Sequence, residues 1–190
     1  MEDASGARTS PGDDLDAVIP AARQGDPLAW EHIYRSLAGR VASYLRVQRA
    51  AEPEDVTSEV FLAVFRNIHN FSGDEAQFRA WVFVIAHRRL LDERRRLGRR
   101  DEEPLDIAAA NATGDTEDDA LRALGTERVE ALCARLPSDQ RGVLLLRLVG
   151  DLSVDQVAGV LGKSPGAVKA LQRRALAALC RLAERNGAPL

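Results

Sequence analysis

A segment near the C-terminus carries the signals of two short helices separated by a tight turn, and it limits the fold of this chain more than any other feature. Ser153 can cap the first helix, because its hydroxyl accepts a free backbone N–H, and Gln156 stands three residues on, where a capping box needs it. Gly162 marks the turn. Ser164 then caps a second helix whose first position is Pro165, where a missing N–H costs nothing. This order predicts a helix-turn-helix.

The two helices have one apolar and one polar side. Apolar residues recur at helical spacing and predict the buried stripes: Val154, Val157, Ala158 and Leu161 in the first helix, and Val168, Leu171, Ala175 and Leu179 in the second. The second helix turns Lys169, Gln172, Arg173 and Arg174 outward. Cations beside an amide suit phosphates and base edges in a major groove, although a helical hairpin with a solvated basic face has the same pattern.

Charge is distributed unevenly along the chain, whose net charge is −3. Residues 27–100 carry 13 basic and 9 acidic side chains, and residues 126–190 carry 10 and 6. Residues 1–26 carry 2 and 6, and residues 101–125 carry 1 and 8. Two basic lobes separated by an acidic link support nucleic-acid binding, with weak affinity for duplex DNA in the free chain.

The distribution of aromatic residues predicts two small domains with separate cores. Every Phe, Trp and Tyr lies between Trp30 and Phe83, whereas the C-terminal third is built from Leu, Val and Ala. Residues 101–125 read as a flexible acidic linker and residues 1–13 as a disordered tail. Fully extended, a linker of about 25 residues spans about 80–90 Å.

Four helices are expected before the linker, and no period-two run predicts a strand. The first runs from Asp14 to Arg23, Asp26 caps the second, and Pro53 begins the third. The fourth follows the loop Asn70–Gln77 and ends in an arginine-rich run. The second and third helices are expected to bury these apolar residues: Leu28, Trp30, Ile33, Tyr34, Leu37, Val41, Tyr44, Leu45, Val56, Val60, Phe61, Val64, Phe65 and Ile68.

The third helix leaves an exposed leucine among charges on its opposite side. That face consists of Asp55, Glu59, Leu62 and Arg66. It is consistent with a protein contact or with ordinary surface.

The sequence offers no signal for an enzyme, a metal site or a membrane segment. It contains no P-loop, dinucleotide turn or nucleophile elbow, and its three histidines have no ligand spacing. We therefore expect a non-enzymatic protein without cofactor, metal or small-molecule substrate. Cys133 and Cys180 occupy apolar helical positions, which predicts buried free thiols. No signal peptide or membrane span is present, so a cytoplasmic location is expected.

The order of these elements resembles the bacterial sigma-70 family, specifically its extracytoplasmic-function (ECF) group. Residues 25–34 resemble the opening helices of the family, residues 54–62 the segment that docks on RNA polymerase, and residues 78–86 with the following arginines the segment that opens the promoter −10 element. The helix-turn-helix and the residues 136–147 before it are similar to the region that reads the −35 element.

The resemblance implies an all-α fold of two helical domains: region 2 at residues 14–100 and region 4 at residues 126–187. It implies an alternative sigma factor that binds the clamp helices and flap of core RNA polymerase and promoter DNA, under the control of an anti-sigma factor that is often membrane-anchored. The residues implied for polymerase docking are Asp55, Glu59, Leu62 and Arg66. Those implied for the −10 element are Phe71, Ser72, Gly73, Asp74, Gln77, Arg79, Trp81, His87, Arg88, Arg94 and Arg95. Those implied for the −35 element are Ser164, Lys169, Gln172, Arg173 and Arg174.

Three positions depart from the family pattern. Arg88 stands where Asn is usual, Ala167 where Thr is common, and Gln156 where Glu is common. The fold should tolerate all three, but the promoter sequence does not follow from the resemblance, because base preference rests on a few such side chains.

Two other kinds of protein would use parts of the same pattern. A stand-alone transcriptional regulator would use the helix-turn-helix but leave the Leu62 face and the arginine run without a role. An adaptor that binds only proteins would leave the basic recognition helix unexplained.

Overall fold

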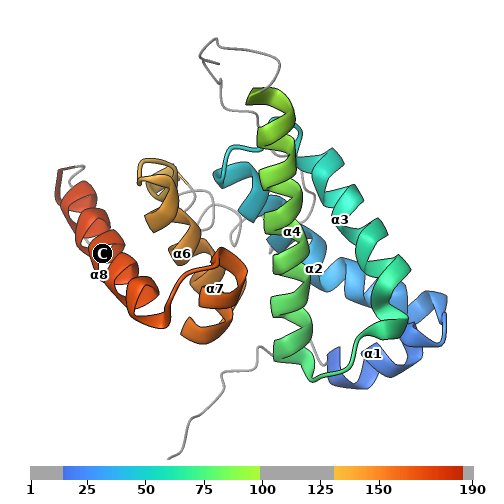
Figure 1. The fold of residues 1–190 in the computed structure, drawn as a ribbon. Helices are drawn as coiled ribbons and strands as arrows, with labels where there is room; N and C mark the ends of the chain where they lie inside the picture. The colour runs from blue at the N-terminus through green and yellow to red at the C-terminus, as the bar shows by residue number, and fades with distance from the viewer. Residues whose placement is uncertain (1–14, 99–130, 186–190) are drawn as a thin grey trace, which may run out of the picture.

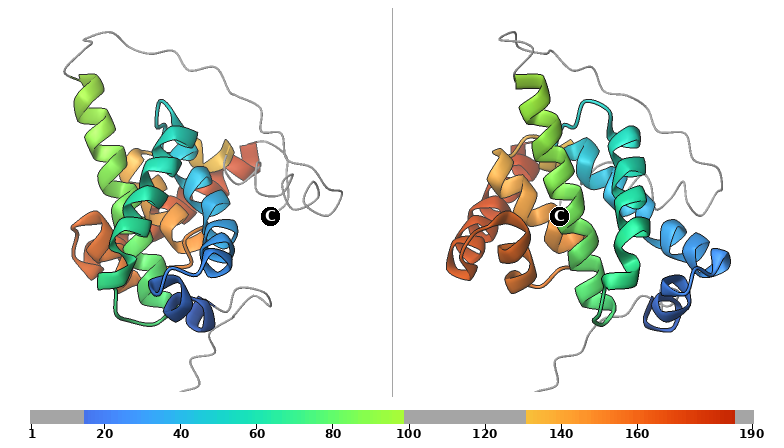
Figure 2. Two further views of the ribbon diagram at one scale, coloured as in Figure 1. Left: turned by 90° about the vertical axis from the view of Figure 1, so that its right-hand side faces the viewer. Right: turned by 45° about the vertical axis from the view of Figure 1, so that its right-hand side comes forward.

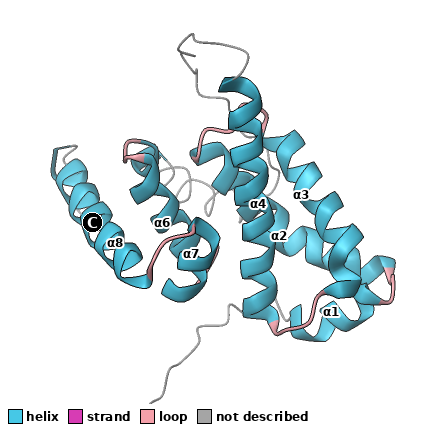
Figure 3. Ribbon diagram, viewed as in Figure 1, coloured by secondary structure: helices cyan, strands magenta, loops and turns pink. Residues whose placement is uncertain are grey.

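The structure, a computed structural model, describes residues 15–98 and 131–185, which contain helices and no strand (Figures 1 and 3). The predicted tail and linker lie outside these ranges. The N-terminal lobe contains α1 (Leu15–Arg23), α2 (Pro27–Val47), α3 (Pro53–Asn67), the 3₁₀ helix η1 (Ile68–Asn70) and α4 (Glu75–Gly98). The C-terminal lobe contains α6 (Ser138–Leu148), α7 (Val154–Leu161) and α8 (Pro165–Arg185). No helix among the described residues is long and apolar enough to cross a membrane.

The predicted helix-turn-helix is confirmed in detail. Gln156 N–H donates to Ser153 Oγ at 3.2 Å, and Ser153 N–H donates to Gln156 Oε1 at 2.8 Å, which completes the capping box. Gly162 closes α7 with φ +62°, a left-handed conformation that an L side chain rarely adopts. Ser164 Oγ accepts the N–H of Ala167 at 3.2 Å at the start of α8.

The N-terminal lobe is a bundle in which α4 packs against α3 and α2, and α1 covers the start of α2. Its core contains the predicted stripes, but three residues expected inside are exposed. Leu28 is 74% exposed, Tyr34 49% and Phe65 52%. The rings of Tyr34 and Phe65 are nevertheless in aromatic contact. Tyr34 packs edge-on against Phe61 at a centroid separation of 4.8 Å, and Phe65 stacks on Trp30 at 5.1 Å.

The composition suggested two separate cores, but in the structure the two lobes pack on each other. In Figures 1 and 2 α7 lies beside α4, and the buried apolar residues of both lobes form one continuous cluster. The reason is steric. Gly150 has no side chain, so Phe83 of α4 approaches it closely: a Cβ atom at Gly150 would lie 3.2 Å from Phe83 Cε2 and 2.7 Å from the carbonyl oxygen of Leu146.

Polar contacts also join the lobes. The Gln156 side chain, which already accepts the capping bond, donates through Nε2 to the carbonyl of Ala76 on α4 at 2.9 Å. Arg141 is 5% exposed, and its Nε lies 3.5 Å from Gln48 Oε1 at the end of α2. Arg49 Nη2 donates across the interface to the carbonyl of Ala134 at 3.2 Å.

The cysteine prediction holds for one residue only. Neither cysteine forms a disulfide with a described residue, and Cys133 is buried, whereas Cys180 is exposed on α8. Helical spacing did not predict this difference, because Cys180 directly follows Leu179, the last residue of the apolar stripe predicted for this helix.

Gln156→Glu should loosen the contact between the lobes. Glutamate can complete the capping box, but it has no N–H to donate to the Ala76 carbonyl, and the two oxygens would repel each other. We expect unchanged helix content by circular dichroism and a larger radius of gyration by small-angle X-ray scattering. Gln172→Glu on α8 is the matched control, since it adds the same charge away from α4. Identical scattering from the wild type and Gln156→Glu would contradict this role of the amide.

Candidate nucleic-acid interface

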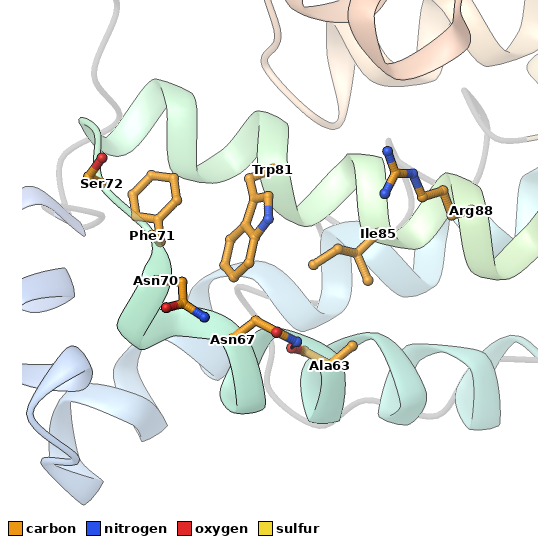
Figure 4. Close-up of a pocket in the computed structure, with 8 residues that line it drawn as sticks. All are labelled: Ala63, Asn67, Asn70, Phe71, Ser72, Trp81, Ile85 and Arg88. Carbon is orange, nitrogen blue, oxygen red and sulfur yellow. Dashed lines mark hydrogen bonds between the residues drawn. The ribbon is translucent and has the colours of Figure 1, made fainter.

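A pocket of about 580 Å³ lies between the end of α3, the following loop and α4. Figure 4 shows Trp81 and Ile85 pointing from α4 toward α3, with Phe71 and Ser72 at one end of the pocket and Arg88 at the other. The lining is completed by Ala63, Asn67 and Asn70. The packing of the C-terminal lobe leaves this side of α4 uncovered, because Ala76, Phe83 and Arg79 meet that lobe instead.

The pocket combines flat aromatic surface with hydrogen-bonding groups. Phe71 and Trp81 stack at a centroid separation of 5.3 Å and an interplanar angle of 28°. Asn67 Nδ2 donates to the carbonyl of Ala63 at 2.7 Å, which fixes the orientation of that amide. Aromatic surfaces with amides and a cation are suited to an unpaired base, which stacks through its face and bonds through its edge.

Four of the predicted −10 residues therefore meet in one pocket: Phe71, Ser72, Trp81 and Arg88. Asn67 and Asn70 were not predicted from the sequence. Trp81, Ile85 and Arg88 follow each other at spacings of four and three and so share one side of α4, but this spacing does not point to the two asparagines on the other side of the pocket.

The other loop residues have a structural task. Asp74 and Gln77 form a reciprocal cap at the start of α4: Gln77 N–H donates to Asp74 Oδ1 at 2.8 Å, and Asp74 N–H donates to Gln77 Oε1 at 3.0 Å. Gly73 between Phe71 and this cap has φ +152°, and a Cβ atom there would collide with the Gln77 side chain. The N–H of Glu75 donates to Asp16 Oδ1 of α1 at 2.6 Å. These contacts hold Phe71 and Ser72 at the mouth of the pocket.

The remaining cations of α4 lie outside the pocket. Arg79 pairs with Glu75 and lies 3.6 Å from Asp151 of the C-terminal lobe, with its side chain 16% exposed. Arg94 donates to the backbone carbonyl of Gln48, and Arg95 lies 3.1 Å from Asp92. In this packed arrangement Arg79 therefore serves the contact between the lobes.

His87 is half-buried on α4, with its Nδ1 2.8 Å from the hydroxyl of Tyr44. Burial lowers the pKa of His87 below its ordinary value, and the nearby charges of Arg94 and Lys163 lower it further. Burial raises the pKa of Tyr44, whose hydroxyl therefore stays protonated. A neutral imidazole that carries its proton on Nε2 accepts a hydrogen bond from the Tyr44 hydroxyl at Nδ1.

The polar side of α8 is open. Ser164, Lys169, Arg173 and Arg174 are exposed, and Gln172 is half-buried. The Lys169, Arg173 and Arg174 side chains make no hydrogen bond or ion pair with any described residue. Val168 and Ala175 are buried on the opposite side, as predicted. A row of free cations on the second helix of a helix-turn-helix is the arrangement that contacts DNA in a major groove.

A second open surface lies on α3. Leu62 is 53% exposed, Asp55 and Arg66 are exposed, and Glu59 lies 3.7 Å from Arg89. Phe65, which the sequence analysis had expected inside, adds an exposed ring beside Arg66. Exposed apolar side chains grouped with charges are typical of a protein-binding surface.

Comparison with known proteins agrees with this arrangement. Residues 31–100 match the family model for Sigma-70 region 2, and residues 126–179 match the model for Sigma-70, region 4. The chain is 31% identical over 180 residues to the ECF RNA polymerase sigma factor SigD of Mycobacterium tuberculosis, covering 90% of this chain and 85% of SigD. It is 34% identical over 171 residues to the ECF RNA polymerase sigma factor BldN of Streptomyces coelicolor, covering 87% of this chain and 64% of BldN.

A solved structure extends the similarity to the fold. CnrH in complex with the cytosolic domain of CnrY superimposes with a TM-score of 0.60 and 25% identity, covering 91% of this chain and 99% of CnrH.

The pKa of His87 leads to a prediction about stability. Because the pKa of His87 in the folded chain lies below 6.5, the unfolded chain takes up this proton first as the pH falls. The free energy of unfolding should therefore fall as the pH is lowered from about 7 through 6.5, until the folded imidazole is also protonated. Urea titrations at several pH values should give a flatter pH dependence of the free energy of unfolding for His87→Gln than for the wild type. Equal slopes in the two proteins would contradict this assignment.

Proposed function

Because the chain belongs to the sigma-70 family, in its extracytoplasmic-function group, we propose that its two lobes divide promoter recognition between the pocket beside α4 and the basic face of α8. Sigma factors bind core RNA polymerase and promoter DNA; they are initiation factors, not enzymes. The observation that carries the proposal is that both family regions match in order, with an aromatic-lined pocket in the first and an open recognition helix in the second.

The pocket is proposed to capture an unpaired base of the −10 element. Opening a duplex costs stacking and pairing energy, and a protein without an ATP-binding motif supplies this energy by binding the separated strand. Phe71 and Trp81 offer the stacking surface, and Asn70, Ser72 and Arg88 the polar edge. The exposed arginines that follow on α4, Arg95 and Arg96, are placed to attract the strand's phosphates.

Region 4 is proposed to read the −35 element through α8. Lys169, Arg173 and Arg174 supply phosphate and base-edge donors, and Gln172 supplies an amide beside them. The two elements are expected to lie up to two turns of duplex apart, at about 34–36 Å per turn, and separated lobes can span that distance because the predicted linker reaches about 80–90 Å. We infer that the contact between α4 and α7 opens when polymerase binds, and that the free chain binds promoters weakly.

The Leu62 face is the proposed polymerase contact. On this face of α3, Leu62 and neighbouring charged side chains remain exposed although both lobes are packed together. A stand-alone regulator has no use for this face, and the match to both family regions does not favour that alternative.

An inhibitory partner is a further part of the proposal. CnrH was solved with the cytosolic domain of CnrY bound, and this chain is similar to CnrH over nearly its whole length. We propose that an anti-sigma factor, anchored in the membrane, holds this chain inactive in the cytoplasm.

Leu62→Glu combined with Arg66→Glu should abolish binding to core RNA polymerase, because a carboxylate at an interface core is desolvated without a partner and the second change reverses a charge. Binding is measured by pull-down with sigma-free core enzyme, and helix content by circular dichroism. The matched control is Leu28→Glu with Arg35→Glu, which makes the same two changes on the exposed side of α2. Retained binding by the α3 variant would refute the assigned face.

In vitro transcription tests the function as a whole. Core RNA polymerase without sigma is supplied with genomic DNA fragments from the source organism, with and without this protein, and transcript 5′ ends are mapped. Discrete new start sites that share two upstream elements are expected. If no start sites appear and core polymerase is not bound either, the sigma function is refuted.

A further inference from the structure

Arg88 is the one charged residue among the described residues that line the pocket. It is exposed at the end of the pocket away from Phe71, and its guanidinium makes no hydrogen bond or ion pair with any described residue (Figure 4). The neighbouring Arg89 differs, because it lies 3.7 Å from Glu59 and does not line the pocket. Arg88 therefore keeps its donors for whatever enters.

The chemistry of the guanidinium limits what it can bind well. It carries five N–H donors in a flat fork and no acceptor, so it pairs best with two acceptors side by side. Guanine presents such a pair at O6 and N7, and cytosine presents one at O2 and N3. In adenine the N6 amino donor lies beside the acceptors N1 and N7, and in thymine the N3–H donor lies between the acceptors O2 and O4, so a fork of donors can use only one group on these edges.

We propose that Arg88 is a specificity-determining residue, which makes the pocket favour guanine or cytosine over adenine or thymine at one unpaired position of the non-template strand. This inference rests on the proposed function of the pocket. An asparagine at this position, with one donor and one acceptor, would accept an edge of adenine equally well. Arg88 therefore distinguishes this chain from relatives with asparagine at the corresponding position.

Asn67 presents a fixed side chain to the base and does not carry the preference. Its amide nitrogen is engaged by the Ala63 carbonyl at 2.7 Å, so the base meets a fixed side chain. The stacked rings of Phe71 and Trp81 offer surface to any base and do not discriminate. The charge and the fork of Arg88 thus carry the selectivity.

The test uses the full chain assembled with core RNA polymerase on a promoter mapped by the transcription experiment above. The −10 bases of the non-template strand are randomised in a pool of pre-melted templates, each marked by a transcribed barcode. Transcript yield for each base at each position is then counted for the wild type, Arg88→Lys and Arg89→Lys. Lysine keeps the positive charge but loses the fork, so it separates base reading from attraction to phosphate.

The wild type and Arg89→Lys should show one position at which guanine or cytosine exceeds adenine and thymine about tenfold. Arg88→Lys should still transcribe, with the excess at that position reduced below about twofold.

Two results would overturn the inference while leaving the proposed function intact: an unchanged base preference in Arg88→Lys, or a wild-type preference for adenine or thymine at every position. Absence of promoter-dependent transcripts from the wild type would instead contradict the proposed function, and the inference with it.

Discussion

Burial of the α4 side chains is the interaction on which the rest of the structure depends. Phe78, Val82, Phe83, Ala86 and Leu90 are fully buried along this helix. Burial of each large side chain of this kind stabilises the fold by about 1.5–3 kcal/mol. Because α4 packs against α3 on one side and α7 on the other, the same helix completes the N-terminal lobe, forms a wall of the base pocket and receives the C-terminal lobe.

Apolar packing holds the lobes together against an unfavourable charge pattern. Both lobes carry more basic than acidic residues, and Arg141 is buried between them with Arg49 and Arg94 close enough to lower its pKa, after the larger effect of burial itself. Carbonyl oxygens compensate in part, since Arg141 Nη1 lies 3.3 Å from that of Ala134 and 3.4 Å from that of Leu136. Separation of the lobes would return these cations to solvent, so electrostatic repulsion and desolvation destabilise the packed arrangement of the lobes, called the closed form below.

Local signals in the sequence predicted local structure well, and contacts between distant segments poorly. The caps at Asp26, Ser153 and Ser164 were all predicted, because each depends on neighbours a few residues away. The exposure of Phe65 was not predicted, because Trp30 of α2 covers one side of its ring and leaves the other side open to solvent. The joined lobes could not be predicted either, because two glycines and one glutamine amide of the C-terminal lobe meet residues of α2 and α4 that lie far from them in the chain. The pocket lies between these cases: helical spacing groups Trp81, Ile85 and Arg88, but only the tertiary fold brings Asn67 and Asn70 opposite them.

The two glycines at the contact between the lobes give the chain a simple route for evolutionary tuning. A Cβ atom at Gly142 would lie 2.8 Å from Gln48 Nε2, and one at Gly150 would lie 3.2 Å from a ring carbon of Phe83. The tightness of the closed form therefore depends on two side chains that are absent. One nucleotide change in either codon can introduce a methyl group or more at the seam. The contact between α4 and the C-terminal lobe can thus loosen between species while every residue of the proposed DNA-binding and polymerase-binding surfaces stays the same.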